Sequence, residues 1–421
     1  MSSKLKKLDV KSKVLVKNTL MLYILQFSSY LFSFITIPYQ TRVLGPNIYG
    51  VLGVAAAVML YFQLFMDFGF LLSATEDIAK NRDDRDYICR KITSIAIIKT
   101  AFGIFSLLIM SVLIFTVPKF SEHKAVYIIY LLAYAVNSFL PDYVYRGIEK
   151  MTAVTMRTIA IKFFFCVMIF VFLRSENDYL AVPVLSLIGN TFAVIFAYVH
   201  LFKSLKYSFK KVSFKEIFGD FKRSSVFFYS RIASTVYSAT NTVILGFVDT
   251  TGIITGYFTS ADKVIVTAKN GLSPISDSLY PYMVKNKDFR PAKKVLTFCM
   301  IPIILGCIIV GIFAKPLCIF AFGKDFAGTA NILRAFLPII AAILPSYILG
   351  FPTMGALGIS KYANFSIFIG TGVHIVGIII LGIFGQINGV SLAIMTSVSE
   401  WSILIYRAII VYKHRHLMNK E

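Results

Sequence analysis

The stretch that decides the fold is residues 17–50, which read KNTLMLYILQFSSYLFSFITIPYQTRVLGPNIYG. Its first part, residues 17–42, is an apolar run with scattered Ser, Thr and Gln, and a helix of about 20 residues is enough to cross a bilayer. A Gly-Pro-Asn turn follows at Gly45 and Pro46, and a second apolar run begins at residue 48. The stretch therefore predicts two spanning helices joined by a tight turn, with Gly45 and Pro46 as turn or close-packing positions.

The rest of the chain repeats this pattern of apolar runs and turns. Of its 421 residues, 57% are apolar and 15% are charged, whereas globular domains have roughly 45–50% and 25%. We therefore predict an all-α polytopic membrane protein with about 12 transmembrane helices, which leaves no room for a sizeable domain outside the bilayer. The apolar runs lie at residues 17–42, 48–72, 92–117, 124–145, 153–173, 180–202, 222–247, 252–282, 295–315, 328–350, 362–384 and 388–412.

The net charge of +22 comes from 43 Lys and Arg residues against 21 Asp and Glu residues. A basic chain can bind nucleic acid, but here the charge follows the loops. With the N-terminus inside, the inner segments carry 30 of the 43 cations, and cytoplasmic loops of membrane proteins are enriched in Lys and Arg. This distribution predicts both termini in the cytoplasm and no nucleic-acid partner. The six outer cations are Arg42, Lys119, Lys124, Arg174, Lys315 and Lys324.

The second half of the chain resembles the first. An Ile-Tyr-Gly motif at residues 48–50 matches Ile-Thr-Gly at residues 254–256, and both follow a long polar-spotted run with a basic flank. This predicts two six-helix bundles, residues 1–210 and 211–421, related by a pseudo-two-fold axis along the membrane normal. Parallel repeats of this kind place a substrate site between the bundles, near the membrane midplane. Any chain of twelve helices can align with itself this loosely, and that alternative stays open.

After the 30 inner and six outer cations are counted, which include those near the ends of the runs, seven cations remain inside the apolar runs. A charge there costs at least about 2.5–3.5 kcal/mol and therefore tends to face a cavity or an ion pair. Within the run at residues 222–247, the stretch 230–242 combines Arg231 with Asn241 and seven hydroxyl residues. We expect this run and those at residues 17–42 and 252–282 to line a polar cavity, although Ser and Thr also mediate helix packing. The seven cations are Lys99, Lys162, Arg231, Lys263, Lys269, Arg334 and Arg407.

The predicted substrate-binding residues are polar side chains that an anionic substrate would meet in such a cavity. Arg231 ranks first, and Lys263 and Lys269 come next. For Lys263 the alternative is a local charge pair with Asp262. The further candidates are Arg334, Lys99, Asn241 and Gln26.

Two other charged residues receive different expectations. Asp67, in the Asp-Phe-Gly segment near the end of the second apolar run, is expected to hold a conformational gate or to bind a backbone group rather than to meet substrate. Arg407, which lies within reach of the cytoplasmic surface, is expected to extend its guanidinium to that surface.

No pattern in the sequence predicts an enzyme, a metal site or a disulfide. The five His residues are scattered, the five Cys residues lie mostly in apolar runs without CxxC spacing, and no GxxxxGK[ST] motif is present. We therefore predict a non-enzymatic protein with no catalytic residue, no metal and no cofactor. Without a nucleotide motif, the energy would come from H⁺ or Na⁺ coupling, from the membrane potential or from downstream consumption of the product.

Several segments resemble a known family. Residues 17–50 and MDFGFLLSATEDIAKNRDD at residues 66–84 look like the opening of the bacterial oligosaccharide flippases, the O-antigen and capsule repeat-unit translocases. SRIASTVYSATNTVILGF at residues 230–247, TSADKVIVTAKNGLSPISDSLYPYM at residues 259–283 and FGKDFAGTANILRAFLP at residues 322–338 are similar to that family's second half. These flippases are part of the superfamily of multidrug, oligosaccharidyl-lipid and polysaccharide exporters.

The resemblance implies a transporter that works by alternating access. Its substrate would be an undecaprenyl-diphosphate-linked oligosaccharide, moved from the cytoplasmic to the outer leaflet of the bacterial inner membrane for O-antigen, capsule or exopolysaccharide synthesis. A polysaccharide polymerase and a chain-length regulator would be its partners. One departure is the pair Glu76-Asp77, because the family pattern has a basic residue beside the glutamate.

Two other functions stay open. A drug or metabolite antiporter of the same superfamily would share the architecture, but a cation extruder needs carboxylates in its cavity, whereas the intramembrane surplus here is positive. A membrane-embedded polysaccharide polymerase would need an acidic cluster or a longer outer loop than this sequence contains.

Overall fold

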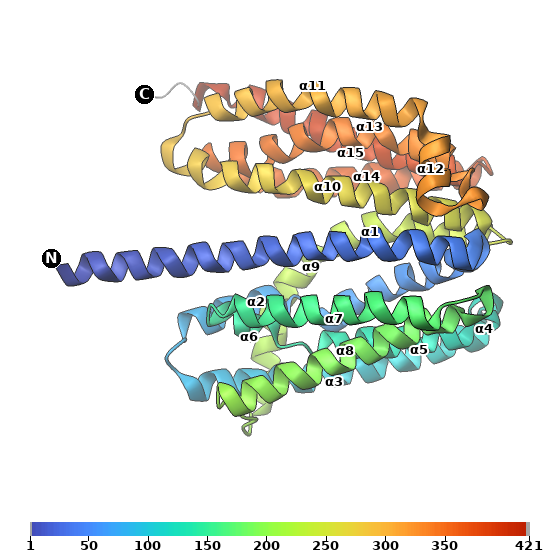
Figure 1. The fold of residues 1–421 in the computed structure, drawn as a ribbon. Coiled ribbons are helices and arrows are strands. Elements are labelled where there is room, and N and C mark those ends of the chain that lie inside the picture. Colours follow the sequence, from blue (N-terminus) through green and yellow to red (C-terminus); the bar gives the residue numbers. More distant parts are fainter. Residues whose placement is uncertain (1, 418–421) are drawn as a thin grey trace. The chain divides into compact units, whose positions relative to one another are not determined.

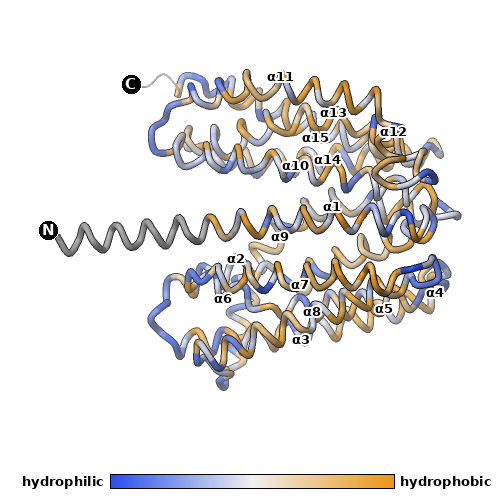
Figure 2. Tube along the Cα trace, in the orientation of Figure 1, coloured by the Kyte–Doolittle hydropathy of each residue, from blue (hydrophilic) through white to orange (hydrophobic). Residues whose placement is uncertain are grey.

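The computed structural model describes residues 2–417, apart from the side chains of residues 2–19, 22, 230 and 233–238. Within that part of the chain every regular element is a helix (Figure 1). Apolar residues run along the helices, and polar residues gather towards the helix ends and in the turns between them (Figure 2). The predicted all-α polytopic fold is confirmed.

The first half of the chain forms α1 to α8. α5 and α7 each pack along α8, so these three helices lie side by side (Figure 1). A 3₁₀ turn at Glu176–Leu180 leads into α8, and a π-helical turn at His200–Ser204 follows it. The helices are α1 (Ser2–Asp67), α2 (Phe70–Lys80), α3 (Arg85–Thr116), α4 (Pro118–Glu122), α5 (Lys124–Ser138), α6 (Asp142–Gly147), α7 (Met151–Phe172) and α8 (Ala181–Val199).

The second half forms α9 to α15. α13 packs against α10, α11 and α15, and α14 packs against α15. α13 continues into a π-helical segment, Leu349–Met354, which is interrupted at Gly350. The helices are α9 (Phe214–Val248), α10 (Ile253–Asn286), α11 (Arg290–Ile312), α12 (Ala314–Phe322), α13 (Thr329–Ile348), α14 (Ser360–Ile383) and α15 (Gly389–Lys413), with 3₁₀ turns at Lys324–Phe326 and Arg415–Leu417.

Nine segments of the described chain are long and apolar enough to cross a membrane. One of them, Tyr23–Lys80, is 58 residues long and holds two of the predicted spans, because α1 is interrupted at Gly45. α9 and α10 are long helices as well but are not among the nine, and the described part of α9 contains the shorter apolar helix Ala239–Val248. The predicted number of about twelve spans is therefore consistent with the structure.

The chain divides into two compact units, and each takes a segment from the other half of the sequence. Segment 45–54 belongs to the second unit and segment 211–235 to the first, which differs from the predicted division after residue 210. The chain thus passes between the units at three places. The two six-helix bundles stay a prediction. The first unit is Met1–Leu44 with Ala55–Thr235, and the second is Gly45–Val54 with Val236–Glu421.

The break in α1 lies at Gly45. Its backbone has φ +67° and ψ 171°, a conformation that glycine adopts at little cost because it has no side chain. Beyond the break the chain packs against the start of α10. A Cβ atom at Gly256 would collide with the carbonyl oxygen of Pro46, and one at Gly50 with that of Gly252. Small residues on both sides allow this backbone contact.

The turn that precedes α10 is held by Asp249. Its carboxylate accepts hydrogen bonds from the backbone N–H and hydroxyl of Thr255, at 2.8 and 3.0 Å, and from those of Thr251, at 3.1 and 2.8 Å. Burial by itself would raise the pKa of Asp249, but these hydrogen bonds outweigh it and keep that pKa below its usual value. The ionised carboxylate thereby satisfies a backbone donor in the first turn of α10.

The end of α1 is fixed in the first unit by aromatic packing. Phe68 is 5% exposed, and its ring stacks on those of Phe221 and Phe228 in α9, with centroids 4.8 and 4.5 Å away. Much earlier in α1, the Met21 carbonyl accepts a hydrogen bond of 3.0 Å from the Thr155 hydroxyl of α7. α1, α7 and the start of α9 are therefore joined within this unit.

The helices turn apolar side chains outward. The most apolar window of α11 contains no buried residue, and Phe298 of that helix is 83% exposed. Apolar patches of this extent are rare on soluble monomers. The surface therefore suits a lipid environment.

Gly256→Ala should destabilise the protein, because the added methyl group would collide with the Pro46 carbonyl. We expect the midpoint of thermal unfolding in detergent to fall by an amount equivalent to about 1–3 kcal/mol. Gly271→Ala is the matched control, since it lies in the same helix and nothing is within 4 Å of its Cβ position. That substitution should be neutral or stabilising, by up to about 1 kcal/mol. Equal midpoints for the two variants would contradict the close contact.

Candidate functional site

A cluster of charged side chains lies inside the first unit. Lys99 of α3 is 5% exposed, and its ammonium nitrogen lies 3.7 Å from Oδ1 of Asp67 at the end of α1. The same ammonium donates to the backbone carbonyl of Ser138 and lies over two aromatic rings. Arg231 of α9 also attracts the Asp67 carboxylate. The structure thus brings together three predicted residues, Asp67, Lys99 and Arg231, from three helices.

Two residues that the sequence did not single out complete this cluster. Asp142, at the start of α6, interacts electrostatically with both Asp67 and Lys99, and its Oδ1 accepts a hydrogen bond of 2.7 Å from Nη2 of Arg157. Arg157 is 6% exposed, and its buried Nε has no hydrogen-bond partner in the described part of the chain. The positive-inside count assigns Arg157 to an inner loop, whereas the structure places its guanidinium in the interior of the unit.

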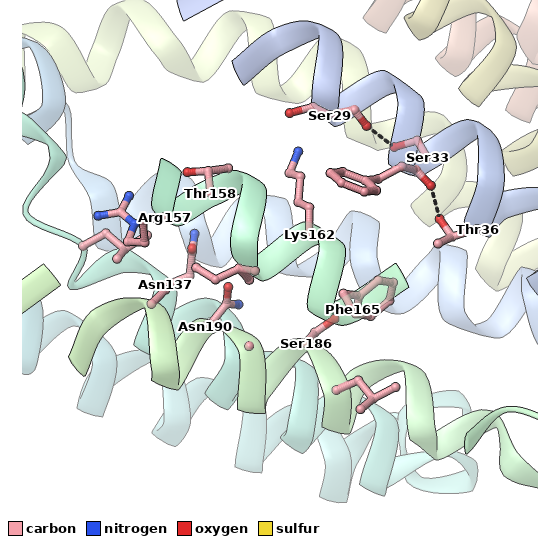
Figure 3. Close-up of a pocket in the computed structure, with 16 residues that line it drawn as sticks. Ser29, Ser33, Thr36, Asn137, Arg157, Thr158, Lys162, Phe165, Ser186 and Asn190 are labelled. Carbon is pink, nitrogen blue, oxygen red and sulfur yellow. Dashed lines mark hydrogen bonds between the residues drawn. The ribbon is translucent and has the colours of Figure 1, made fainter. Parts of the chain in front are cut away.

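A cavity of about 310 Å³ lies next to Arg157 and is lined from α1, α5, α7 and α8 (Figure 3). In this view the Lys162 side chain extends from α7 towards the part of α1 that carries Ser29 and Ser33. Lys162 lies near the middle of α7, about 16 Å from its start and about 15 Å from its end at 1.5 Å per residue. No hydrogen bond or ion pair joins its ammonium group to another described residue.

The hydroxyl groups of α1 that line the cavity donate to their own helix. Ser29 donates to the carbonyl of Leu25 at 2.7 Å, Ser33 to that of Ser29 at 2.9 Å and Thr36 to that of Phe32 at 2.9 Å. Two of these bonds are drawn in Figure 3. The α1 side of the cavity therefore presents hydroxyl oxygens that can accept hydrogen bonds, because their protons are donated to backbone carbonyls. The cationic donors at the cavity, Arg157 and Lys162, come from α7.

The second unit contains an ion pair between two spanning helices. Nζ of Lys269 in α10 lies 2.5 Å from Oε1 of Glu400 in α15, and the two side chains are 19% and 10% exposed. Asp262, about two helical turns before Lys269 in α10, attracts both Lys263 and Lys269. Lys269, predicted as a substrate-binding cation, is paired with a carboxylate in this structure. Lys263 is exposed and lies close enough to Asp262 for electrostatic attraction, as in the alternative left open for it.

Asn241 lies in a buried polar network rather than on an open surface. Its Nδ2 donates to the Thr396 hydroxyl at 2.8 Å, and its Oδ1 lies 3.0 Å from Nε2 of His374. Nδ1 of His374 lies 3.2 Å from the Ser399 hydroxyl, and both Asn241 and His374 are less than 5% exposed. Hydrogen bonds of this kind join α9, α14 and α15 inside the unit.

The expectation that Arg407 reaches the surface is wrong. The residue is 7% exposed. Its guanidinium donates to the Ser346 carbonyl at 2.7 Å, the Ser366 hydroxyl at 2.9 Å and the Ala363 carbonyl at 3.4 Å. The π-helical break at Gly350 allows this approach, because a Cβ atom there would lie 2.8 Å from Nη1 of Arg407. Backbone carbonyls and hydroxyls satisfy this cation, so it has no need to reach water.

The remaining predicted residues lie apart from these clusters. Nε of Arg334 donates to the carbonyl of Gly311 near the end of α11, at 2.9 Å, where a cation also interacts favourably with the helix dipole. Gln26 is exposed on α1 and donates to the hydroxyl of Tyr30 at 2.7 Å. Gly45 and Pro46 lie at the break described above, in the second unit.

No group of three or more potential metal ligands occurs among the residues that the structure describes, and all five cysteines are free. The polar groups collected in the spanning helices can bind charged or hydrogen-bonding molecules.

Comparison with known proteins identifies the family. The model of the family described as polysaccharide biosynthesis proteins matches residues 15–287, which is more than half of the chain. The chain belongs to this family. The expected relationship to polysaccharide export is thereby confirmed at the level of the family.

Two relatives of this chain carry the name “Putative O-antigen transporter”. The one from Escherichia coli (strain K12) is 26% identical over 265 residues, which cover 63% of this chain and 64% of that protein. The one from Shigella dysenteriae is 28% identical over 339 residues, which cover 79% of this chain and 84% of that protein. The match thus spans less than two thirds of the E. coli relative.

Solved structures share the fold at low identity. One is titled “Lipid II flippase MurJ, inward closed conformation”; it is 14% identical, with a TM-score of 0.68 over 94% of this chain and 87% of that one. Another is an inward-facing multidrug resistance MATE family transporter of the MOP superfamily, 13% identical, with a TM-score of 0.68 over 95% and 99% of the two chains. The names of these relatives are those of transporters and a flippase, not of enzymes.

The carboxylate of Asp77 forms ion pairs with two cations of the first unit. The Asp77 side chain is 4% exposed and lies 2.9 Å from Nζ of Lys91 and 2.8 Å from Nη2 of Arg223. Lys91 also contacts Asp220, so α2, α3 and the start of α9 are linked. Asp77, the second carboxylate of the Glu76-Asp77 pair, therefore holds two cations in the first unit.

Breaking the Lys269–Glu400 pair should show that the two charges depend on each other. We expect Lys269→Met and Glu400→Gln each to lower the unfolding midpoint in detergent, because one buried charge loses its partner, at about 3–5 kcal/mol for a fully buried pair. The double variant should lose less stability than the sum of the single variants. Additive losses in this double-mutant cycle would show that the pair contributes no coupling.

Proposed function

We propose that the chain is a flippase that moves an undecaprenyl-diphosphate-linked oligosaccharide from the cytoplasmic to the outer leaflet of the bacterial inner membrane by alternating access. Family membership and the names of the relatives support a lipid-linked glycan as substrate. The likeness to a lipid II flippase in fold is compatible with a substrate that has a diphosphate, a sugar head and a lipid tail. The glycan would serve O-antigen, capsule or exopolysaccharide synthesis.

The observation that carries the proposal is the position of several cations. They lie inside units whose helices have apolar outer surfaces. Lys99, Arg157 and Lys162 of the first unit and Lys269 and Arg407 of the second lie in spanning helices. A diphosphate needs cations and hydrogen-bond donors to replace water when it enters the membrane. The interior thus suits the polar head of such a lipid, while the apolar outer surface suits its tail.

We propose different parts for the predicted residues. Arg231 would contact the diphosphate, because it is a half-buried cation in the polar helix α9. Lys263, Lys269, Arg334, Lys99, Asn241 and Gln26 would contribute to binding during other steps of transport. For Lys269 and Lys99 this requires their present carboxylate partners to release them. Asp67, which holds Lys99, would act as a gate, and Gly45 and Pro46 as a structural break.

The orientation and energy source are part of the same proposal. The positive-inside distribution supports cytoplasmic termini. An H⁺ or Na⁺ gradient, the membrane potential or downstream consumption of the product would drive transport, and the polymerase and chain-length regulator would act next on the exported units.

Deletion of the gene should remove the surface glycan and leave lipid-linked repeat units in the cytoplasmic leaflet. Arg231→Ala should fail to restore the glycan, whereas Arg231→Lys should restore part of it, because the positive charge is kept. Surface glycan is measured on gels, and the amount and folding of each variant by detergent-solubilised size-exclusion chromatography. Lys315→Gln, an exposed lysine of α12, controls for a change in net charge.

Three outcomes would contradict parts of this proposal. Full glycan with Arg231→Ala would exclude Arg231 as a binding residue. Unpolymerised units in the outer leaflet of the deletion strain would indicate a polymerase. An unchanged glycan together with drug sensitivity would indicate an antiporter.

A further inference from the structure

We infer that the cavity of the first unit is an oxyanion-binding site in which Lys162 and Arg157 are the binding cations. The ligand would be the diphosphate or a sugar carboxylate of the transported lipid, and this identity rests on the proposed function. The site differs from the predicted set, which contains neither residue. It depends on four observations: an unpaired charge, an unsatisfied donor, the other donors at the cavity wall, and the cavity's size.

The charges at the cavity do not balance. Lys162 forms no ion pair with a described residue, and the single carboxylate bound to Arg157 is that of Asp142. Arg157 and Lys162 line the cavity, whereas no Asp or Glu does. Near the middle of a spanning helix an uncompensated ammonium is strongly unfavourable. An anion in the cavity would remove that cost, and a cationic drug or a metal ion would increase it.

Arg157 offers a hydrogen bond that no described residue accepts. One terminal nitrogen of Arg157 donates a 2.7 Å hydrogen bond to the Asp142 carboxylate, and this bond holds the guanidinium in place. Its Nε is buried without a partner in the described chain. A buried donor that stays unpaired costs about 1–3 kcal/mol. A ligand oxygen would satisfy it, and a charged oxygen would do so most strongly.

The other polar groups at the wall suit a phosphate or sugar. The amide of Asn137 and the hydroxyl of Ser186 line the cavity and donate to no other described group. They lie on α5 and α8, across the cavity from α1 (Figure 3). On the opposite wall, the oxygens of Ser29 and Ser33 can accept hydrogen bonds from sugar hydroxyls, since their own protons are directed to the helix backbone.

The cavity admits only part of the proposed substrate. Its volume of about 310 Å³ is at the lower end of the range of small-molecule pockets, about 300–1,000 Å³. A diphosphate or one acidic sugar fits this volume, whereas a complete repeat unit with its lipid does not. The site would therefore bind one charged group while the rest of the molecule lies elsewhere.

The test uses the purified full-length chain in detergent, with thermal unfolding followed as inorganic pyrophosphate or glucuronate is added at constant ionic strength in chloride. We expect a saturable rise of the wild-type midpoint with one of the two probes. Lys162→Gln should weaken that response by about tenfold or more, because a charge-assisted contact is lost. Lys162→Arg should retain it, and Lys315→Gln should respond like the wild type.

The stability of the variants without a probe distinguishes a binding lysine from a structural one. Lys162→Gln should unfold at the same temperature as the wild type or a higher one, because it removes a partly buried charge that has no partner among the described residues. Arg157 is unsuitable for this comparison, since its substitution would leave Asp142 without its partner. A marked loss of stability in Lys162→Gln, with its probe response intact, would overturn the inference.

The two probes separate the two possible groups. A response to pyrophosphate alone assigns the site to the diphosphate, and a response to glucuronate alone assigns it to an acidic sugar. No saturable response to either, or equal responses in wild type and Lys162→Gln, would overturn the site. Failure of the proposed function would look different: the purified protein would bind the anion, but deletion of the gene would leave the surface glycan unchanged.

Discussion

A charge in the hydrocarbon core must be compensated within the protein, because the bilayer supplies no hydrogen bonds. This constraint organises the interior of both units. Lys99 is held by Asp67 and Lys269 by Glu400, while Arg407 is held by backbone carbonyls and hydroxyls. Each of these contacts joins different helices of one unit. The cations that stand out in an apolar chain therefore contribute to the packing of its helices, and only a cation without such a partner remains available to a ligand.

The helices were predictable because a spanning helix is determined locally. Its backbone bonds are internal, and its length and apolar composition follow from the bilayer. The runs at residues 362–384 and 388–412 accordingly match α14 and α15 to within two residues at each end. The Gly-Pro break at Gly45 was readable for the same reason. The division into units was less accessible, because segment 45–54 joins the second unit through contacts with α10 that only the folded chain reveals.

The site was only partly predictable, since the partners of a charge are not encoded near it. Lys269 and Glu400 are separated by 131 residues, and no local pattern connects them. Arg407 was assigned to the surface from its distance to the end of its helix, but the carbonyls that bind it belong to α13 and α14. Lys162 was recognised as an intramembrane cation, yet only the structure distinguishes it from neighbours that have partners.

The exchange of short segments between the units has a mechanical consequence. Two bodies joined by one flexible connection can turn about it in many directions. Here the backbone crosses at residues 44–45, 54–55 and 235–236, so every movement of one unit against the other must satisfy three covalent attachments at once. Such a linkage reduces the number of independent motions. It favours a path in which a few backbone torsions at the crossings change together while each unit keeps its internal packing.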